Sequence, residues 1–309
     1  MHTLSHRIPL AAGTLLAALS LASAPAPVGA QGARFAREGA RATAAPAPAP
    51  ALRRYGAATK VGQGAIRPYV TLDPATNEPL EIGVAFDEGA LQGLPTDGAG
   101  HHGQPGAVHQ YILQFPATAT PFQFLEVNWN PMGHEPDGVY AGVPHFDFHF
   151  YTISQAERDA IMPSDPRWAE KANDIPTGEY VPAFNVPLGP PGAKPAAVAV
   201  PMMGVHWSDL RSPELQKLLG KPEAYQPFTA TFIHGSWAGR YIFWEPMITR
   251  AHLLAKRDAA DPAVRDQVLP IPVPAKYHVP GFYPDAYRIT WDAEAKEYRV
   301  ALTGMAKRG

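Results

Sequence analysis

Apolar and polar residues alternate most strictly near the middle of the chain, in the segment "HFDFHF" at 145–150. Successive side chains of a β-strand point to opposite faces, so a two-residue period indicates a strand. The three phenylalanines of this segment then share one face, which suits a hydrophobic core. His145, Asp147 and His149 share the other face. The pattern therefore predicts a strand that is apolar on one side and rich in titratable groups on the other.

Strand-like patterns bounded by turn residues recur along much of the remaining sequence. Single strands are predicted at 69–73, 79–86, 107–115, 123–130, 145–153 and 201–210. Two hairpins are predicted after them, one over 228–247 that turns at Gly235–Gly239 and one over 287–302. Because short turns join most of these strands, we expect a mainly β fold, either an antiparallel β-barrel or a β-sandwich, with a few short peripheral helices.

Three short helices are predicted between the strands. Ser154 and Glu157 form a capping box that begins a helix directly after the central strand. Further helices are predicted at 212–220 and at 249–258. The segment 163–200 is rich in proline and glycine, which predicts an irregular excursion that can cover another part of the fold.

The N-terminal end resembles a targeting segment more than a part of the fold. The apolar run that follows His6 and Arg7 has the length of a signal peptide, and the small residues at 28–30 suit a cleavage site. We therefore expect 1–30 to be a signal peptide, the mature chain to begin at Gln31, and the protein to be periplasmic or secreted. A retained N-terminal anchor is the alternative.

A stretch rich in alanine and proline follows at 31–54 and shows no apolar periodicity. Alternating Ala-Pro favours extended conformations and cannot bury a core, so this stretch is predicted to be a disordered linker. The folded part is then expected to be a single β-rich domain at 55–309.

Composition excludes several classes of site and partner. The chain contains no cysteine, which excludes disulfides and cysteine-based zinc sites. Its 26 Lys and Arg residues nearly balance 28 Asp and Glu residues. Because no basic cluster follows the linker, we expect neither nucleic acid nor a membrane surface as a partner, and no stable membrane insertion. A homo-oligomer stays open.

The polar face of the central strand carries only side chains that can ligate a metal. Residues two apart on a strand are about 6.6 Å apart and can converge on one ion, whereas residues four apart are about 13 Å apart and cannot. Asp147 is therefore expected to share an ion with one of its two histidine neighbours, unless a bulge intervenes. Alternatively, Asp147 orients a ligating histidine by accepting its ring proton.

The remaining ligands must come from other parts of the chain. His134 and Glu135 lie in the preceding Gly/Pro loop, while His206, His234 and Glu245 interrupt apolar strands. The expected metal ligands are His134, His145, Asp147, His149 and His206. Glu135 and Glu245 are expected to act as general base or orienting group. At least one of His206 and Glu245 should approach the polar face to within about 5 Å.

Donor chemistry suggests the identity of the ion. Imidazole and carboxylate without thiolate suit a divalent metal, with zinc as the first expectation, and manganese or iron if carboxylates predominate. The ordinary interpretation also has weight: such a strand can be a solvated polar face, and His206 beside Trp207 can be a hydrogen-bonded core residue.

The segment "NPMGHEPDGVYAGVPHFDFHFY" also carries a resemblance. It resembles a bacterial family of exported proteins known mainly as a domain of unknown function, and the similarity extends over most of 67–250. The strings "MGVHWSD" and "FTATFIHGSWAGRYIFWEPMIT" belong to it. The resemblance implies a β-rich fold and no settled activity.

Three functions are consistent with the sequence. The first is an exported protein that binds a metal or a ligand at its histidine-rich face without catalysis. The second is a metal-dependent hydrolase or lyase that acts on a small molecule. The third is an oligomeric structural or stress protein in which the histidines only form hydrogen bonds. Metal analysis and the accessibility of the ion to water separate them.

Overall fold

Residues 51–98 and 108–309 are described by the computed structural model, and all of them belong to one compact unit, Pro48–Gly309. The predicted signal peptide at 1–30 and most of the predicted linker lie outside the described residues. The linker prediction is wrong at its end, because a strand already begins at Leu52. This strand is fixed by pairing with a neighbour and by Arg53, whose guanidinium donates to Thr71 Oγ1 at 3.3 Å.

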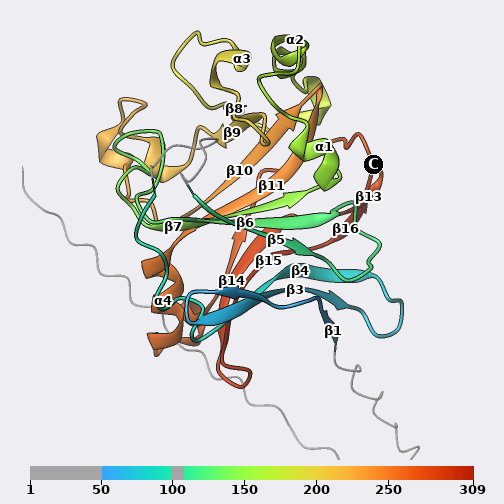
Figure 1. The fold of residues 1–309 in the computed structure, drawn as a ribbon, viewed down its shortest axis with the longest axis vertical. Coiled ribbons are helices and arrows are strands. Elements are labelled where there is room, and N and C mark those ends of the chain that lie inside the picture. Colours follow the sequence, from blue (N-terminus) through green and yellow to red (C-terminus); the bar gives the residue numbers. More distant parts are fainter. Residues whose placement is uncertain (1–50, 99–107) are drawn as a thin grey trace, which may run out of the picture. The chain divides into compact units, whose positions relative to one another are not determined.

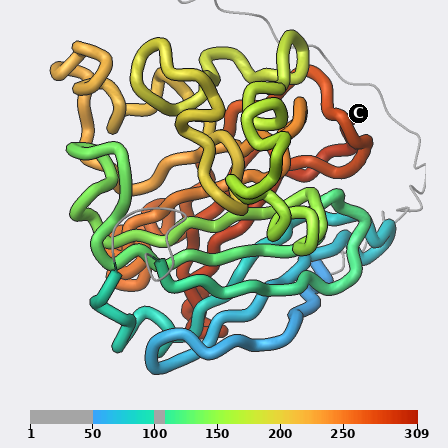
Figure 2. The backbone as a smooth tube through the Cα atoms, turned by 45° about the horizontal axis from the view of Figure 1, so that its top comes forward, coloured from blue at the N-terminus to red at the C-terminus, as the bar shows by residue number. Residues whose placement is uncertain are grey.

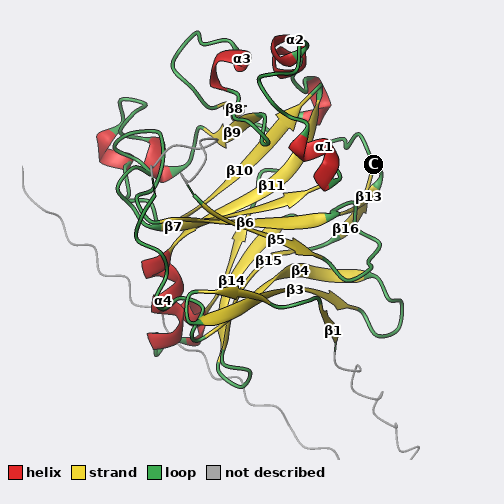
Figure 3. Cartoon of the chain, viewed as in Figure 1, coloured by secondary structure: helices red, strands yellow, loops and turns green. Residues whose placement is uncertain are grey.

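Two seven-stranded sheets and one small sheet form the fold (Figure 3). Sheet A consists of β1 (Leu52–Tyr55), β2 (Thr59–Val61), β3 (Gly64–Leu72), β4 (Pro79–Asp87), β12 (Asp266–Pro270), β14 (Ala286–Asp292) and β15 (Glu297–Thr303). Sheet B consists of β5 (His109–Gln114), β6 (Phe124–Asn130), β7 (His145–Tyr151), β8 (Asn185–Pro187), β9 (Val205–Asp209), β10 (Ala230–Trp237) and β11 (Arg240–Thr249). The small sheet consists of β13 (Gly281–Tyr283) and β16 (Ala306–Arg308).

The strand orders are far from sequential. Sheet A has the order β1-β3-β4-β15-β14-β12, with β2 also paired to β3, and sheet B has the order β5-β6-β7-β11-β10-β9-β8. Every strand pair is antiparallel. Strand β7 therefore lies near the middle of sheet B, between strands that come from both sides of it in the sequence.

Helices are short and lie outside the sheets. They are α1 (Gln155–Asp159), α2 (Trp168–Asn173), α3 (Pro195–Val198), α4 (Arg250–Asp258) and α5 (Pro262–Arg265), with single 3-10 turns η1 (Gly178–Tyr180), η2 (Pro213–Leu215) and η3 (Pro222–Ala224). Figure 1 shows α2 and α3 on the side of sheet B that faces away from β3 and β4.

The hydrophobic core lies between the two large sheets. Phe86 on β4 packs edge-on against Phe146 and Phe148 on β7, with ring centroids 5.4 and 5.9 Å apart. Both sheets are open, and residues from their facing sides form one apolar cluster. The fold is thus a β-sandwich with short peripheral helices, which confirms the predicted mainly β class and selects the sandwich over the barrel.

The polar side of β7 lies on the outer face of sheet B, yet it is buried. His145, Asp147 and His149 are each 0% exposed. Loops cover them: Tyr140 from the β6–β7 connection and Phe228 from the β9–β10 connection pack in a second apolar cluster on this face. In Figure 2 the segment between β7 and β10 passes over sheet B on the side away from sheet A. Loops therefore cover one outer face of the sandwich.

Local sequence signals were confirmed at several elements. The capping box of α1 is present, with Ser154 and Glu157 bonding reciprocally. Thr249 caps α4, and the hairpin of β10 and β11 turns at Ala238 and Gly239, both with positive φ. The helix predicted at 212–220 is wrong.

Only the 3-10 turn η2 forms in that segment. The Ser212 side chain makes no cap hydrogen bond there. Instead the side chain of Gln216 donates to the carbonyls of Leu210 and Ser212 at 2.8 and 3.0 Å. These bonds hold a compact loop in place of further helical turns.

Candidate metal centre

The register of sheet B determines which polar side chains meet on its loop-covered outer face. Asp147 on β7 pairs with Asn128 on β6 and with Met247 on β11. Because β7 and β11 also pair at Phe150 and Trp244, Glu245 lies across from His149. Six of the titratable residues on this face form two groups, which we call site 1 and site 2.

Site 1 consists of His134, His145 and Asp147, whose ligand atoms lie within 4.8 Å of one another. His134 comes from the loop between β6 and β7, and the other two come from β7. Nε2 of His134 lies 3.4 Å from Oδ2 of Asp147, and Nε2 of His145 lies 3.2 Å from Oδ1. Asn130 on β6 donates to Oδ2 of the same carboxylate at 2.7 Å. The Nε2 atoms of two imidazoles thus lie next to one buried carboxylate.

Backbone hydrogen bonds define the tautomers of both histidines. Nδ1 of His134 contacts the carbonyl of Glu135 at 2.7 Å, and Nδ1 of His145 contacts the carbonyl of Val143 at 2.6 Å. A carbonyl only accepts, so each Nδ1 carries a proton, and the Nε2 atom of a neutral ring has a lone pair. Both Nε2 atoms face the oxygens of Asp147. These electron-rich atoms are stable side by side when the rings are protonated or when a cation lies among them.

Electrostatics favour a charged Asp147. Burial alone would raise the pKa of its carboxyl, but the imidazoles of His145 and His134 outweigh burial and hold the pKa well below its usual range. The group is therefore an ionised carboxylate in a region with no direct contact with solvent. Such a charge needs a positive partner.

Site 2 consists of His149, His206 and Glu245, whose ligand atoms also lie within 4.8 Å of one another. The three residues come from β7, β9 and β11. Nε2 of His149 lies 3.3 Å from Oε1 of Glu245, and Nε2 of His206 lies 3.9 Å from Oε2. His149 and Glu245 are almost completely buried, while the side chain of His206 is 12% exposed. The approach of Glu245 to the polar face of β7 is closer than the 5 Å limit expected from the sequence.

Burial keeps site 2 neutral when no ion is bound. Burial raises the pKa of Glu245 well above its usual range, and the carboxyls of Asp147 and Glu126 add to the rise. Burial also lowers the pKa of His149 to about 3 and that of His206 to about 4. A neutral imidazole is the form that ligates metals, whereas Glu245 would have to release its proton to a metal ion.

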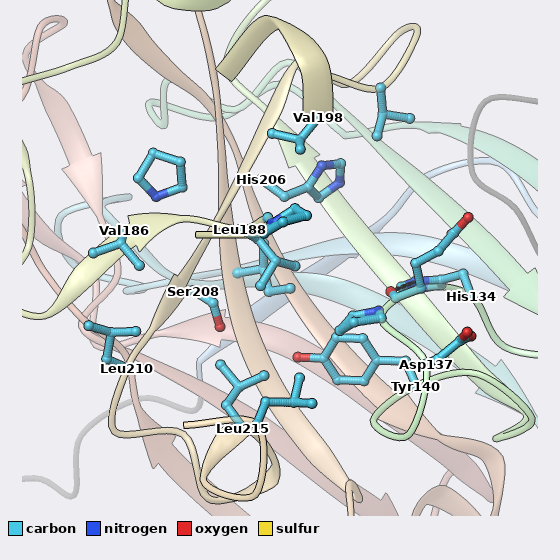
Figure 4. Close-up of a pocket in the computed structure, with 18 of the residues that line it drawn as sticks. His134, Asp137, Tyr140, Val186, Leu188, Val198, His206, Ser208, Leu210 and Leu215 are labelled. Carbon is cyan, nitrogen blue, oxygen red and sulfur yellow. Dashed lines mark hydrogen bonds between the residues drawn. The ribbon is translucent and has the colours of Figure 1, made fainter. Parts of the chain in front are cut away.

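A pocket of about 810 Å³ opens onto the same face. His134 of site 1 lines it, as do His206 and Glu245 of site 2. Its apolar walls include Val186, Leu188, Val198, Val200, Leu210, Leu215, Leu218, Leu219, Ile233 and Met247. Figure 4 shows Val186 and Leu210 on the side of the pocket opposite His134 and Asp137. Several wall residues belong to the segment 163–200, the irregular excursion expected from the sequence.

The structure places the candidate residues from the sequence in different surroundings. Asp147 meets His145, its neighbour at two residues, while His149 turns to Glu245 on the adjacent strand. Glu135 is exposed on the pocket lining.

His234, a candidate ligand, belongs to neither site. It lies on the opposite face of β10 from the pocket residue Ile233. Its ring packs against Phe232 and Trp244, with centroids 5.0 and 5.4 Å apart. Its Nδ1 lies 3.0 Å from Nδ2 of Asn185. Ile233 lines the pocket and its neighbour His234 does not, because adjacent residues of a strand point to opposite faces.

Two residues that contact site 1 were not identified from the sequence. Asn130 donates to Asp147, and the alternation of Asn128 and Asn130 around Trp129 was a signal for a second polar face. Tyr140 covers site 1, with its ring centroid 5.6 Å from that of His134 and 6.2 Å from that of His145. No periodic pattern marks Tyr140, because it lies in a loop.

Comparisons with known proteins find no matching family model, and neither curated proteins nor solved structures match the chain at a significant level. The resemblance to a bacterial exported family therefore stays a prediction. Among residues 51–98 and 108–309, no helix is both long enough and apolar enough to cross a membrane.

Proposed function

We propose that this protein binds a divalent transition-metal ion at site 1 and receives a small, largely apolar organic molecule in the pocket beside it. The proposal follows from the residues that converge on this face and from the apolar walls above them. Non-catalytic binding is the simplest function of this arrangement, and catalysis is a second candidate.

One observation carries the metal proposal. The rings of His134 and His145 donate their Nδ1 protons to backbone carbonyls and direct Nε2 toward the carboxylate of Asp147. Backbone carbonyls that orient the rings of ligating histidines are a regular feature of metal sites in proteins. Three donor atoms leave further coordination positions for water or an organic ligand.

The donor set suits zinc first. Two imidazole nitrogens and one carboxylate oxygen form a zinc site when a water completes the tetrahedron. The same three donors also hold iron(II) in a facial arrangement, so iron is the main competitor. Metal analysis by mass spectrometry of protein purified without a histidine tag identifies the ion.

Apolar walls indicate the second ligand. Leucine, isoleucine, valine and methionine side chains enclose much of the pocket, and its polar groups are His134, Glu135, Asp137, Tyr140, His206, Ser208 and Glu245. Pockets of this composition bind ligands through apolar burial and orient them through a few polar contacts. The pocket therefore suits an apolar molecule with one polar group that points to the histidines.

Metal titration of the chelator-treated protein tests the proposal. We expect Asp147→Asn, which preserves side-chain shape, to weaken zinc affinity at site 1 by about 100-fold or more, since groups outside the ligand shell already change it 10–100-fold. His252→Ala is the matched control, because His252 bonds to Gln267 on the distant β12 strand. If Asp147→Asn leaves the calorimetric titration unchanged, Asp147 does not ligate the ion and the metal proposal for site 1 fails.

A metal-dependent hydrolase or lyase is the second candidate, favoured by carboxylates in the pocket lining. Glu135 lies there next to His134, and Glu245 lies there next to His206. A bound metal ion supplies an acidified water in such sites. We expect Glu135→Gln to retain the metal and to reduce turnover of small apolar esters about 100-fold or more, the range for a general base. Absence of turnover by the zinc-loaded protein leaves non-catalytic binding as the function.

Export from the cytoplasm is part of the proposal. It is supported by the apolar N-terminal run and its small-residue motif at 28–30. N-terminal sequencing of protein from the cell envelope should begin at Gln31, and a sequence that begins at Met1 would contradict export with cleavage.

A further inference from the structure

We propose that site 2 binds a second divalent ion, and that this ion, rather than the one in site 1, contacts the molecule in the pocket. The inference rests on the proposed metal function, but its test separates the two sites. Site 1 and site 2 share no residue. Two ions would therefore bind without a carboxylate that bridges them.

Burial without hydrogen bonds is the first argument. His149 is 0% exposed, and neither of its ring nitrogens makes a hydrogen bond within residues 51–98 and 108–309. Oε2 of the buried Glu245 also makes no hydrogen bond with any of these described residues. Buried polar atoms are nearly always satisfied in native proteins. A cation between Nε2 of His149 and the carboxylate would give a partner to Nε2 and to Oε2 of Glu245.

Positioning by three rigid strands is the second argument. His149, His206 and Glu245 project from β7, β9 and β11 of one sheet, and no loop is needed to bring them together. Gly235 on β10 lies between two of these strands and pairs with His206. A Cβ at Gly235 would lie 1.9 Å from the ring of Phe243, so only glycine leaves space for this ring next to His206 and His149. The surroundings of the two imidazoles are closely packed.

Access to the pocket distinguishes the two sites. Two of the three site 2 residues, His206 and Glu245, line the pocket, whereas His134 alone does so for site 1. Asp147 and His145 are covered by the loop that carries Tyr140. An ion in site 2 thus has an open side toward the apolar chamber, while an ion in site 1 is more enclosed. Closed coordination is typical of structural ions and open coordination of reactive ones.

Cobalt(II) is the probe for the experiment, because its visible absorption reports coordination. Chelator-treated wild-type protein should bind two equivalents. Glu245→Gln, which preserves side-chain shape, should bind one, and so should His206→Ala on the pocket wall. Asp147→Asn should bind one, at site 2. His252→Ala should bind two. Far-ultraviolet circular dichroism and thermal unfolding without metal show that each variant is folded.

Stoichiometry then separates the two proposals. Two equivalents in Glu245→Gln would overturn the second site. One equivalent in wild type that is lost in Asp147→Asn and kept in Glu245→Gln would overturn site 2 and leave site 1 standing. The reverse result would support site 2 and overturn site 1. One equivalent lost in both variants would mean a single ion held by both groups, which also overturns the inference.

Azide tests which ion faces the pocket. Azide should shift the spectrum of cobalt in Asp147→Asn, where site 2 alone is filled. It should leave the spectrum unchanged in Glu245→Gln, where site 1 alone is filled. A shift confined to Glu245→Gln would overturn the assignment of site 2 as the ion that meets the ligand.

Discussion

His234 should make the protein lose stability as the pH falls below neutrality. It lies outside both metal groups, and burial lowers its pKa from 6.5 to about 3. The folded state therefore keeps the imidazole neutral, while the unfolded chain takes up a proton below pH 6.5. The stability that results is complete above pH 6.5 and is lost progressively between pH 6.5 and pH 3.

The magnitude follows from these two pKa values. At pH 5 the unfolded imidazole is almost fully protonated and the folded one is almost fully neutral. Each unit between the pH and the unfolded pKa costs about 1.36 kcal/mol, so the loss between pH 7.5 and pH 5 is about 2 kcal/mol. His149 and His206 also have lowered pKa values, and their contributions must be separated from that of His234.

Urea denaturation of wild type and of His234→Gln, each at pH 7.5 and pH 5 with a chelator present, makes this separation. The other histidines titrate in both proteins, so the difference between the two pH dependences isolates His234. Wild type should lose about 2 kcal/mol more than the variant. His278→Gln, at an exposed ring that stacks on Tyr180, is the control and should stay closer to wild type, because partial burial and the charge of Arg240 lower the pKa of His278 less strongly. A difference below about 0.5 kcal/mol would refute the assignment of a buried neutral imidazole.

Two further substitutions test the structure around the site. Arg158→Met leaves Glu126 buried without its cation and should lower the free energy of unfolding by about 3–5 kcal/mol; a loss below about 1 kcal/mol in urea denaturation would show that Glu126 is protonated or solvated. Thr249→Ala removes the side chain that accepts from the His252 N–H at the start of α4 and should cost about 0.5–2 kcal/mol without changing the metal stoichiometry. Changed stoichiometry in this variant would mean that α4 and the metal centre are coupled.

Short-range signals in the sequence predicted the elements of the site better than its surroundings. The alternation along β7 predicted both faces of the strand. It did not decide whether the polar face is solvated. The structure shows that the face is buried, because loops cover the outer face of a sandwich. Tyr140 and Phe228 make this cover from segments without periodicity, and such contacts leave no pattern in the sequence.

Which candidate residues meet in space depends on the order of strands in the sheet, which is a long-range property. Glu245 meets His149 because β11 pairs with β7, although 95 residues separate the two positions. The hairpin of β10 and β11 does contain local information about the facing of His234. Its register pairs Ile233 with Glu245, so His234 must point to the other face. A hairpin register worked out from the turn would have removed His234 from the candidate ligands.

Strand β7 also has a consequence for how this protein can change over evolutionary time. Its seven residues assign packing to even positions and polar chemistry to odd positions from 145 to 149. A saturation mutational scan of this segment should show tolerance with a period of two. Phe146, Phe148 and Phe150 should accept other large apolar residues, whereas His145 and Asp147 should accept almost none where metal loading is selected. Under the metal proposal, lineages can thus adjust thermal stability and metal affinity by independent mutations within one short segment.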